Sequence, residues 1–214
     1  MKKILISIVA VIAAVATVQA GPAVVNNSKF VAPMHEAPGG AYVALYGGAN
    51  FLHTGLPTGI DDKVGWNAGI KLGYEFAPCS TPGFIPALEL DQMYQSFDLR
   101  AKVDQGGKVK TKTYGYHAML NALAKYDCGN GVIPYGGFGL GWYYWNLKAD
   151  GGASTSKNGF AWALIAGVDF ALDANWAIFV EYKWLNFQIR KHKDFDTAAR
   201  IGQQVVNLGA RYRF

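Results

Sequence analysis

The sequence predicts an all-β protein, a closed antiparallel eight-stranded transmembrane β-barrel with up-and-down topology. Apolar residues recur at every second position in eight successive segments, and clusters of Gly, Pro, Asn or Asp separate these segments. Aromatic residues gather toward the ends of the apolar faces, whereas Gly, Asn and charged residues occupy the opposite faces. Aromatic residues at both ends of a lipid-facing strand form the two interfacial girdles of a membrane barrel, and a polar face suits its lumen.

The first residues predict export. Residues 1–20 hold a positive start, a short apolar run and small residues at the end, which is the pattern of a cleaved secretory signal peptide. The run is shorter than the ~20 residues that a membrane-spanning helix needs. Residues 21–39 contain three prolines and no clear period, so we expect an irregular periplasmic segment. The barrel domain is therefore assigned to residues 40–214.

Composition and charge narrow the function. The chain is 51% hydrophobic and 16% charged. Without residues 1–20 it keeps 18 Lys and Arg against 15 Asp and Glu, a net charge of +3. So mild an excess does not indicate a nucleic-acid partner. No second long apolar run follows the first, so the apolar residues belong to alternating strands.

Each of the eight segments is expected to cross the membrane once. We expect strands at about 41–50, 66–76, 86–97, 114–126, 137–144, 160–170, 176–184 and 206–214. The first is apolar on both faces. The third changes parity after Asp91, which predicts a β-bulge. Segments of roughly 10–13 residues suffice for a tilted crossing, and closure removes the sheet edges that hydrocarbon would not tolerate.

The connections are expected to alternate between long and short. If both termini are periplasmic, the longer loops lie outside and the shorter turns lie inside. The expected outer loops are 51–63, 98–110, 147–158 and 186–201, and the expected periplasmic turns are 77–85, 127–133 and 172–175.

Strand parity assigns an equal number of cations and anions to the lumen. The inward set is Lys71, Lys125, Lys183, Arg211 and Arg213 against Glu75, Glu89, Asp91, Asp169 and Glu181. Buried charges persist when they are paired, so a balanced set predicts an interlocked polar plug, whereas a permeation path would favour one sign. The alternative is that errors of parity produce the balance. Gly137, Gly139 and Gly141 share this face without a phosphate-binding motif, and we interpret them as room for long neighbouring side chains.

No catalytic or metal site is expected. A lipid-modifying barrel enzyme would need a Ser nucleophile and a His base near the outer rim. The serines beyond the signal peptide are Ser28, Ser80, Ser96, Ser154 and Ser156. His117 is expected mid-strand in the lumen, with no serine in its own strand. His53 and His192 are expected in outer loops, where a pairing with Ser154 or Ser156 stays open.

The only two cysteines, Cys79 and Cys128, fall in expected periplasmic turns that are adjacent at one rim. The periplasm is oxidising, and an even cysteine count in an exported chain favours a bridge. We therefore expect an intramolecular disulfide, and the alternative is two free thiols.

Four motifs resemble the small outer-membrane β-barrel family that includes the OmpX-like and opacity-type surface proteins. They are residues 42–48, 134–141, 166–170 and 207–214. The resemblance implies a porin-like eight-stranded β-barrel domain in the bacterial outer membrane, with no single activity. The last motif is similar to the family's assembly signal through Gly209, Tyr212 and Phe214, which implies recognition by the barrel-assembly machinery.

Basic residues gather in two expected outer loops. The cluster is Arg100, Lys102, Lys108, Lys110 and Lys112 with Arg190, Lys191, His192 and Lys193, offset by Asp98, Asp104, Asp194 and Asp196. Lys and Arg at such a rim pair with phosphate or sulfate through charge-assisted hydrogen bonds. Lipopolysaccharide phosphates and an anionic surface polymer on another cell are both open as partners.

We therefore expect a non-enzymatic bacterial outer-membrane surface protein that acts through its extracellular loops in adhesion, surface recognition or envelope integrity. A narrow porin-like channel for small solutes is the alternative, followed by a lipid-modifying enzyme. The expected partners are outer-membrane lipid, lipopolysaccharide, the barrel-assembly machinery and an anionic surface polymer. No cofactor is expected.

Overall fold

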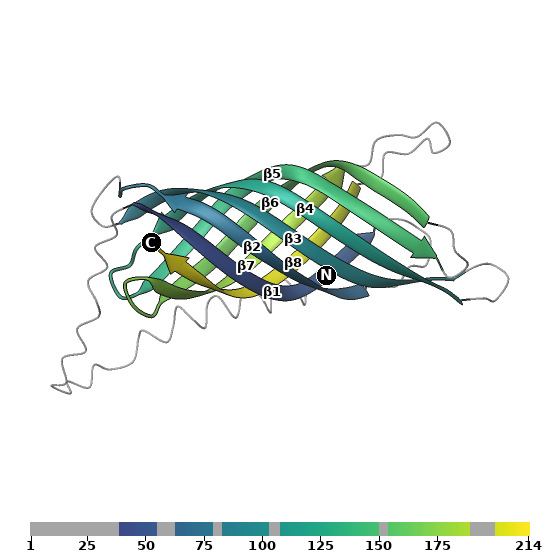
Figure 1. The fold of residues 1–214 in the computed structure, drawn as a ribbon, viewed down its shortest axis with the longest axis horizontal. Helices are drawn as coiled ribbons and strands as arrows, with labels where there is room; N and C mark the ends of the chain where they lie inside the picture. The colour runs from purple at the N-terminus through teal and green to yellow at the C-terminus, as the bar shows by residue number, and fades with distance from the viewer. Residues whose placement is uncertain (1–38, 55–62, 79–82, 103–107, 150–153, 189–199) are drawn as a thin grey trace. The chain divides into compact units, whose positions relative to one another are not determined.

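Eight strands close into one antiparallel barrel in the computed structural model, which describes residues 39–54, 63–78, 83–102, 108–149, 154–188 and 200–214 (Figure 1). The strands are β1 (Gly40–Thr54), β2 (Lys63–Glu75), β3 (Phe84–Lys102), β4 (Lys108–Tyr126), β5 (Val132–Ala149), β6 (Ser154–Ala171), β7 (Trp176–Gln188) and β8 (Arg200–Arg213). Each strand pairs with its sequence neighbours, and β1 closes the barrel by pairing with β8. The predicted fold class is confirmed. Within the described ranges, no helix is long and apolar enough to span a membrane.

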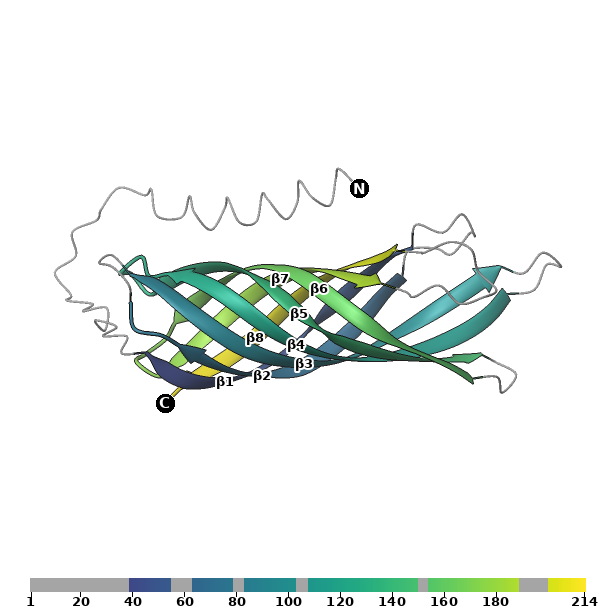
Figure 2. The ribbon, with the colours of Figure 1, turned by 90° about the horizontal axis from the view of Figure 1, so that it is seen from above.

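The two ends of the barrel differ. The terminal rim holds the start of β1, the end of β8 and the connections that follow β2, β4 and β6. There the Phe214 N–H donates to the Ala41 carbonyl at 3.0 Å. The opposite end, here the distal rim, is uneven. Strands β3 to β6 have 18 or 19 residues, whereas β1, β2, β7 and β8 have 13 to 15. Figures 1 and 2 show the longer strands extending past the others at the distal rim.

Local hydrogen bonds hold the turns of the terminal rim. In the β6–β7 turn, the Asp173 carboxylate accepts the N–H groups of Trp176 at 2.7 Å and Asn175 at 2.8 Å. These two donors hold the pKa of Asp173 below its usual range. In the β4–β5 turn, Gly129 and Gly131 have φ of 74° and 81°, a left-handed conformation that glycine adopts without strain.

The distal strands are longer than expected, and the expected loops are correspondingly shorter. Residues 98–102 and 108–110, assigned to a loop by sequence, continue the β3–β4 ladder to the register pair Lys102 and Lys108. Strand β8 likewise begins at Arg200 rather than near residue 206. The sequence prediction ended each strand where the apolar face ended. Backbone pairing continues beyond that point because each strand still satisfies the N–H and C=O groups of its neighbour, whatever the side chains face.

The predicted bulge in β3 is wrong. The pairing of β3 with β2 and with β4 runs without interruption past Asp91. The apparent change of parity comes from side-chain chemistry, because Met93 and Phe97 are apolar yet buried in the lumen, while Gln92 is exposed on the outer wall. The lumen is not polar along its whole length.

The outer wall is apolar and carries aromatic residues near both ends of the strands. Exposed side chains include Leu72, Leu90 and Leu120 between the ends. One aromatic band contains Trp66, Tyr94, Tyr116, Trp142 and Trp184, and the other contains Tyr74, Phe84, Tyr126, Trp176 and Phe214. Two girdles separated by an apolar band are the surface that a lipid bilayer requires.

Inside the barrel, aromatic rings lie across from glycines on the next strand. The facing pairs are Tyr42 and Gly73, Tyr46 and Gly69, Trp145 and Gly115, Tyr135 and Gly167, and Phe179 and Gly209. A Cβ atom at any of these glycines would meet the facing aromatic side chain. Gly137, Gly139 and Gly141 have the same relation to Leu123, Asn121 and Met119 of β4. The glycines thus let large side chains lie along the wall and fill the lumen.

Adding one methyl group at such a position should destabilise the barrel. In Gly69→Ala the new Cβ would meet the Tyr46 ring and the Gln92 carbonyl oxygen. We expect the free energy of unfolding to fall by about 1–3 kcal/mol, the usual cost of overpacking. Urea unfolding in phospholipid, followed by heat-modifiable gel mobility, measures this change.

Gly47→Ala is the matched control, because its new Cβ would face outward with only the Asn67 carbonyl oxygen nearby, at 3.6 Å. We expect this variant to unfold like the wild type. Equal destabilisation of both variants would show that backbone conformation, and not the Tyr46 contact, is responsible.

Candidate functional site

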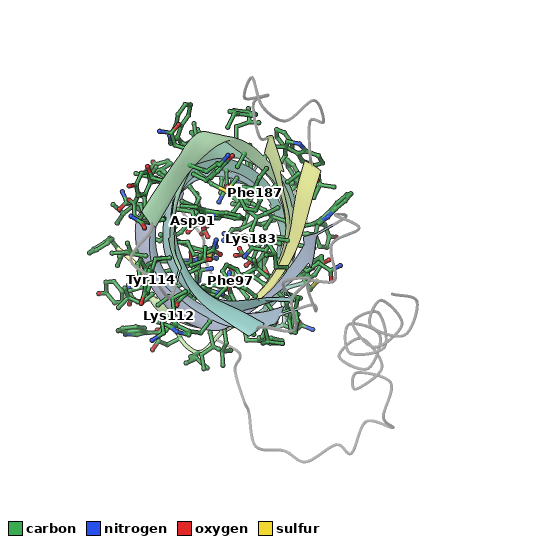
Figure 3. All side chains as sticks on the ribbon, turned by 90° about the vertical axis from the view of Figure 1, so that its right-hand side faces the viewer. Asp91, Phe97, Lys112, Tyr114, Lys183 and Phe187 are labelled. Carbon is green, nitrogen blue, oxygen red and sulfur yellow. The ribbon has the colours of Figure 1, made fainter. Side chains whose placement is uncertain are left out.

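Ten charged side chains project into the lumen from six strands. They are Lys71 and Glu75 of β2, Glu89 and Asp91 of β3, Lys125 of β4, Asp169 of β6, Glu181 and Lys183 of β7, and Arg211 and Arg213 of β8. None is more than 8% exposed. Viewed from the distal end, Figure 3 shows Asp91 and Lys183 inside the ring of strands. Strand alternation assigned these ten residues to the inward face, and the structure places them there.

One half of the network lies toward the terminal rim. The Lys125 ammonium lies 2.7 Å from a Glu75 oxygen and 2.9 Å from an Asp169 oxygen. Arg213 donates through Nε to Glu75 at 3.0 Å, and Arg211 pairs with Asp169. Three cations therefore surround two carboxylates, so this half is one positive charge in excess.

The other half lies nearer the middle of the barrel and has the opposite excess. Lys71 lies 3.1 Å from Glu89 and 2.5 Å from Glu181. Lys183 pairs with Asp91 and lies 3.2 Å from Glu181. Arg211 joins the halves, because its Nη2 lies 3.6 Å from Glu89. The network as a whole is neutral, which favours the folded state because each unpaired buried ion would cost several kcal/mol.

Three tyrosines donate hydrogen bonds to three of the five carboxylates. The hydroxyl of Tyr42 donates to Glu89 at 2.9 Å, that of Tyr46 to Asp91 at 2.6 Å and that of Tyr135 to Glu181 at 3.2 Å. The rings also contact the cations, with the Arg211 guanidinium carbon 4.5 Å from the Tyr42 ring centroid. These tyrosines were not predicted from the sequence, because the strand that holds Tyr42 and Tyr46 is apolar on both faces; Tyr135 has the same inward parity as Gly137.

A layer of uncharged polar groups lies on the distal side of the ion pairs. The Gln95 side-chain oxygen accepts from Asn50 at 3.1 Å and from Gln203 at 2.6 Å, and Asn67 donates to Asn50 at 2.5 Å. The Trp145 indole N–H donates to His117 Nε2 at 3.1 Å. An indole nitrogen only donates, so Nε2 of His117 is the nitrogen without a proton.

Aromatic residues close the lumen beyond this layer. The Phe187 ring centroid lies 4.8 Å from that of Trp145, 5.0 Å from that of Tyr143 and 5.2 Å from that of His117. Figure 3 shows Phe187 and Phe97 inside the ring of strands. Lys71, Asp169 and Glu181 are completely buried behind this layer and expose no surface to solvent.

The remaining predicted site residues are distributed as follows. Arg100, Lys102, Lys108 and Lys110 lie in the distal β3–β4 ladder, whereas Arg190, Lys191 and Lys193 lie outside the described residues. Cys128 is exposed in the β4–β5 turn and Cys79 lies outside the described residues, so the disulfide stays a prediction. In the part of the chain with described positions, no group of three or more His, Cys, Asp or Glu is placed to hold a metal ion.

The serines and histidines considered for catalysis are not brought together where they are described. His117 contacts Trp145 and Gln95 in the lumen, and Ser96 lies on the opposite face of β3. Ser156 is exposed, and His53 and Ser154 lie within β1 and β6. Ser28, Ser80 and His192 lie outside the described residues.

The predicted assembly signal forms the end of β8. Gly209 lies between Tyr46 of β1 and Phe179 of β7. The Tyr212 ring lies 5.0 Å from that of Trp176 and 5.2 Å from that of Phe214. Phe214 is 77% exposed at the terminal rim. Its recognition by the barrel-assembly machinery stays a prediction.

Comparison with known proteins relates the chain to one family. Residues 7–214 match the model of the outer membrane protein β-barrel domain. The crystal structure of Neisserial surface protein A is 18% identical with a TM-score of 0.56, over 83% of this chain and 100% of that one. The crystal structure of the Yersinia pestis attachment invasion locus protein Ail, in complex with the heparin analogue sucrose octasulfate, is 19% identical with a TM-score of 0.49. This match also covers 83% of this chain and 100% of that one. These similarities to solved structures concern the fold alone. No curated protein sequence matches the chain.

Removing one cation from the network should destabilise the barrel, because its carboxylate partners would stay buried without a counter-charge. Lys71→Met would leave Glu89 and Glu181 without their shared ammonium group. We expect a loss of about 3–5 kcal/mol in the free energy of unfolding, as for other broken buried pairs. The double variant Lys71→Met with Glu181→Gln should recover part of the loss, because it restores neutrality.

The exposed Lys112 provides the control, since Lys112→Met removes a cation without leaving a buried carboxylate unpaired. Urea unfolding in phospholipid measures the free energy of unfolding of each variant. A Lys71→Met protein as stable as the wild type would mean that the lumen admits water and that the pairs are not buried in solution.

Proposed function

Because the chain belongs to the outer membrane protein β-barrel domain family, we propose that it is a non-conducting surface protein whose distal rim faces outward and binds anionic partners. Its location is the bacterial outer membrane, in which the barrel spans the bilayer. The observation that carries the proposal is the neutral, solvent-inaccessible network across the lumen.

The network argues against a pore in two ways. An eight-stranded barrel is only wide enough for side chains to fill its interior, and here long side chains from six strands do so. A path for charged solutes is lined by one predominant sign of charge, whereas this lumen holds five cations and five anions in mutual contact. Opening such a path would require separating buried ion pairs.

The uneven rims support the orientation. Membrane barrels of this kind have short periplasmic turns and longer extracellular parts. The connections at the two rims are similar in length, apart from residues 189–199 between β7 and β8 at the distal rim. The rims differ mainly in the long strands β3 to β6, which end at the distal rim. The outward-facing end is therefore the one where β3 to β6 project.

The distal end of the β3–β4 ladder concentrates positive charge. Arg100 pairs in register with Lys110, and Lys102 pairs with Lys108. Like charges directly opposite each other weaken strand pairing. A bound anion relieves this repulsion, so the ladder is suited to phosphate or sulfate groups. This supports an anionic polymer or the phosphates of lipopolysaccharide as partners of this segment.

The proposal predicts that the pure protein does not form stable pores. Refolded protein incorporated into planar bilayers should show no stable single-channel steps of porin size, because the ion-pair network closes the lumen. A large porin in the same bilayers serves as the control for incorporation. Reproducible large steps from the pure protein would contradict the closed lumen.

The proposal also predicts binding to sulfated polymer through the β3–β4 ladder. Replacing Arg100, Lys102, Lys108 and Lys110 with Gln should weaken binding to a heparin-like polymer about tenfold, since an ion pair formed in water contributes only about 0.2–1 kcal/mol. Binding should also weaken as salt screens exposed charges over roughly 8–10 Å. A second variant, in which Gln replaces Arg190, Lys191 and Lys193, tests the expected fourth outer loop in the same way.

Lys157→Gln is the control, because Lys157 is exposed near the start of β6 and lies outside the ladder. Surface-immobilised polymer and purified protein in detergent suffice for the measurement. Absence of wild-type binding even at low salt would refute the polymer as a partner.

A further inference from the structure

The outer wall contains a pocket that neither the lumen nor the basic ladder explains. It has a volume of about 410 Å³ and lies on β2, β3 and β4 toward the distal rim. Its lining residues are Val64, Gly65, Trp66, Ser96, Lys112 and Tyr114. Figure 3 shows Lys112 and Tyr114 on the outside of the ring of strands, away from the lumen.

The register of the three strands creates this pocket. Trp66 of β2 is paired with Ser96 of β3, which is paired in turn with Tyr114 of β4. A small serine therefore lies between two large aromatic side chains. Tyr94 joins the two sides, with its ring centroid 5.8 Å from that of Trp66 and 6.4 Å from that of Tyr114. Lys112, two residues before Tyr114 in β4, places a cation on the distal side.

The lining combines three kinds of group. Aromatic rings pack against the apolar faces of a sugar through dispersion and hydrophobic contact. The Ser96 hydroxyl offers a hydrogen-bond donor and acceptor, and the exposed Lys112 ammonium offers charge-assisted hydrogen bonds to phosphate. The volume lies within the 300–1,000 Å³ range that is common for small-ligand sites. A phosphorylated sugar satisfies all three kinds of group at once.

The position of the pocket indicates a lipid as the source of that sugar. Val64 is 65% exposed and Trp66 is 55% exposed on the lipid-facing side of the barrel. Trp66 belongs to the distal aromatic band, the level at which headgroups begin. Toward the terminal rim the same strands expose Ile70, Leu72 and Leu90, an apolar wall along which acyl chains can lie.

We propose that this pocket binds the phosphorylated glucosamine headgroup of lipid A, the glycolipid anchor of lipopolysaccharide, with Lys112 on a phosphate and the sugar between Trp66 and Tyr114. The inference rests on the outward orientation of the distal rim proposed above. It is independent of whether the lumen conducts and of whether the β3–β4 ladder binds polymer.

The competing explanation is that Lys112 only balances Asp98, its register partner in β3. Opposite charges in facing positions attract each other, so both explanations use the same ammonium group. The two explanations predict different effects of Asp98→Asn on lipid binding. Loss of the competing charge strengthens binding of a phosphate at Lys112, whereas a cation that serves only Asp98 leaves lipid binding unaffected.

The experiment measures lipid binding to the full chain in detergent micelles by native mass spectrometry. Bisphosphorylated lipid A, dephosphorylated lipid A and soluble glucosamine phosphate are titrated separately. We expect the bisphosphorylated lipid to bind best. Lys112→Gln should weaken its binding about three- to tenfold, the effect of one exposed charge-assisted contact. Ser96→Trp should weaken it at least as much by filling the pocket, and Asp98→Asn should strengthen it.

Lys157→Gln is the matched control, because it removes an exposed distal cation outside the pocket and should leave binding unchanged. Heat-modifiable gel mobility verifies that each variant is folded. Wild-type affinity in both Lys112→Gln and Ser96→Trp overturns the site, as does an equal loss in Lys157→Gln, which would indicate unspecific charge attraction. Soluble glucosamine phosphate binding as tightly as the lipid overturns the lipid source. Because neither conductance nor polymer binding is measured, failure here is distinguishable from failure of the proposed function.

Discussion

Buried charge must be neutralised where it lies, and in this barrel that requirement links six of the eight strands. Lys71 of β2 contacts carboxylates of β3 and β7, and Lys125 of β4 contacts carboxylates of β2 and β6. Arg211 of β8 reaches β6 and β3. Most of these pairs join strands that are not adjacent in the sheet, such as β2 with β7 and β4 with β6. All of them can therefore form together only when the barrel is closed. The network therefore opposes both opening of the barrel and passage through it.

The glycines and the tyrosines of the wall serve this same network. Tyr42 lies across Gly73 and donates to Glu89, and Tyr46 lies across Gly69 and donates to Asp91. Tyr135 has the same relation to Gly167 and Glu181. An inward glycine lets the ring lie against the neighbouring strand, and that position brings its hydroxyl to a carboxylate. Packing of the wall and hydrogen bonding of three of the buried acids thus depend on the same facing pairs.

The filled lumen and the outside of the barrel therefore differ in what they can contribute to function. The lumen between the terminal rim and Phe187 is filled by contacts that stabilise the fold. The groups that remain available for partners lie on the wall and at the distal rim, where Lys112 and the β3–β4 ladder extend past the aromatic band. Loops and strand ends on a stable scaffold are the usual place for binding functions.

The sequence by itself determined the fold class, the number of strands and the inward face of most strands, because a two-residue period in a membrane barrel leaves each side chain only lipid or lumen to face. The ten lumen charges could be assigned in this way from Lys71 to Arg213. Only the tertiary structure decided which cation meets which carboxylate, since Lys71 and Glu181 are far apart in sequence and meet across the lumen. It also decided the continuity of β3 past Asp91 and the pocket at Ser96, because both depend on the register with β2 and β4. Alternation within one strand carries no information about its register with the next, and register is what sets side chains of different strands in contact.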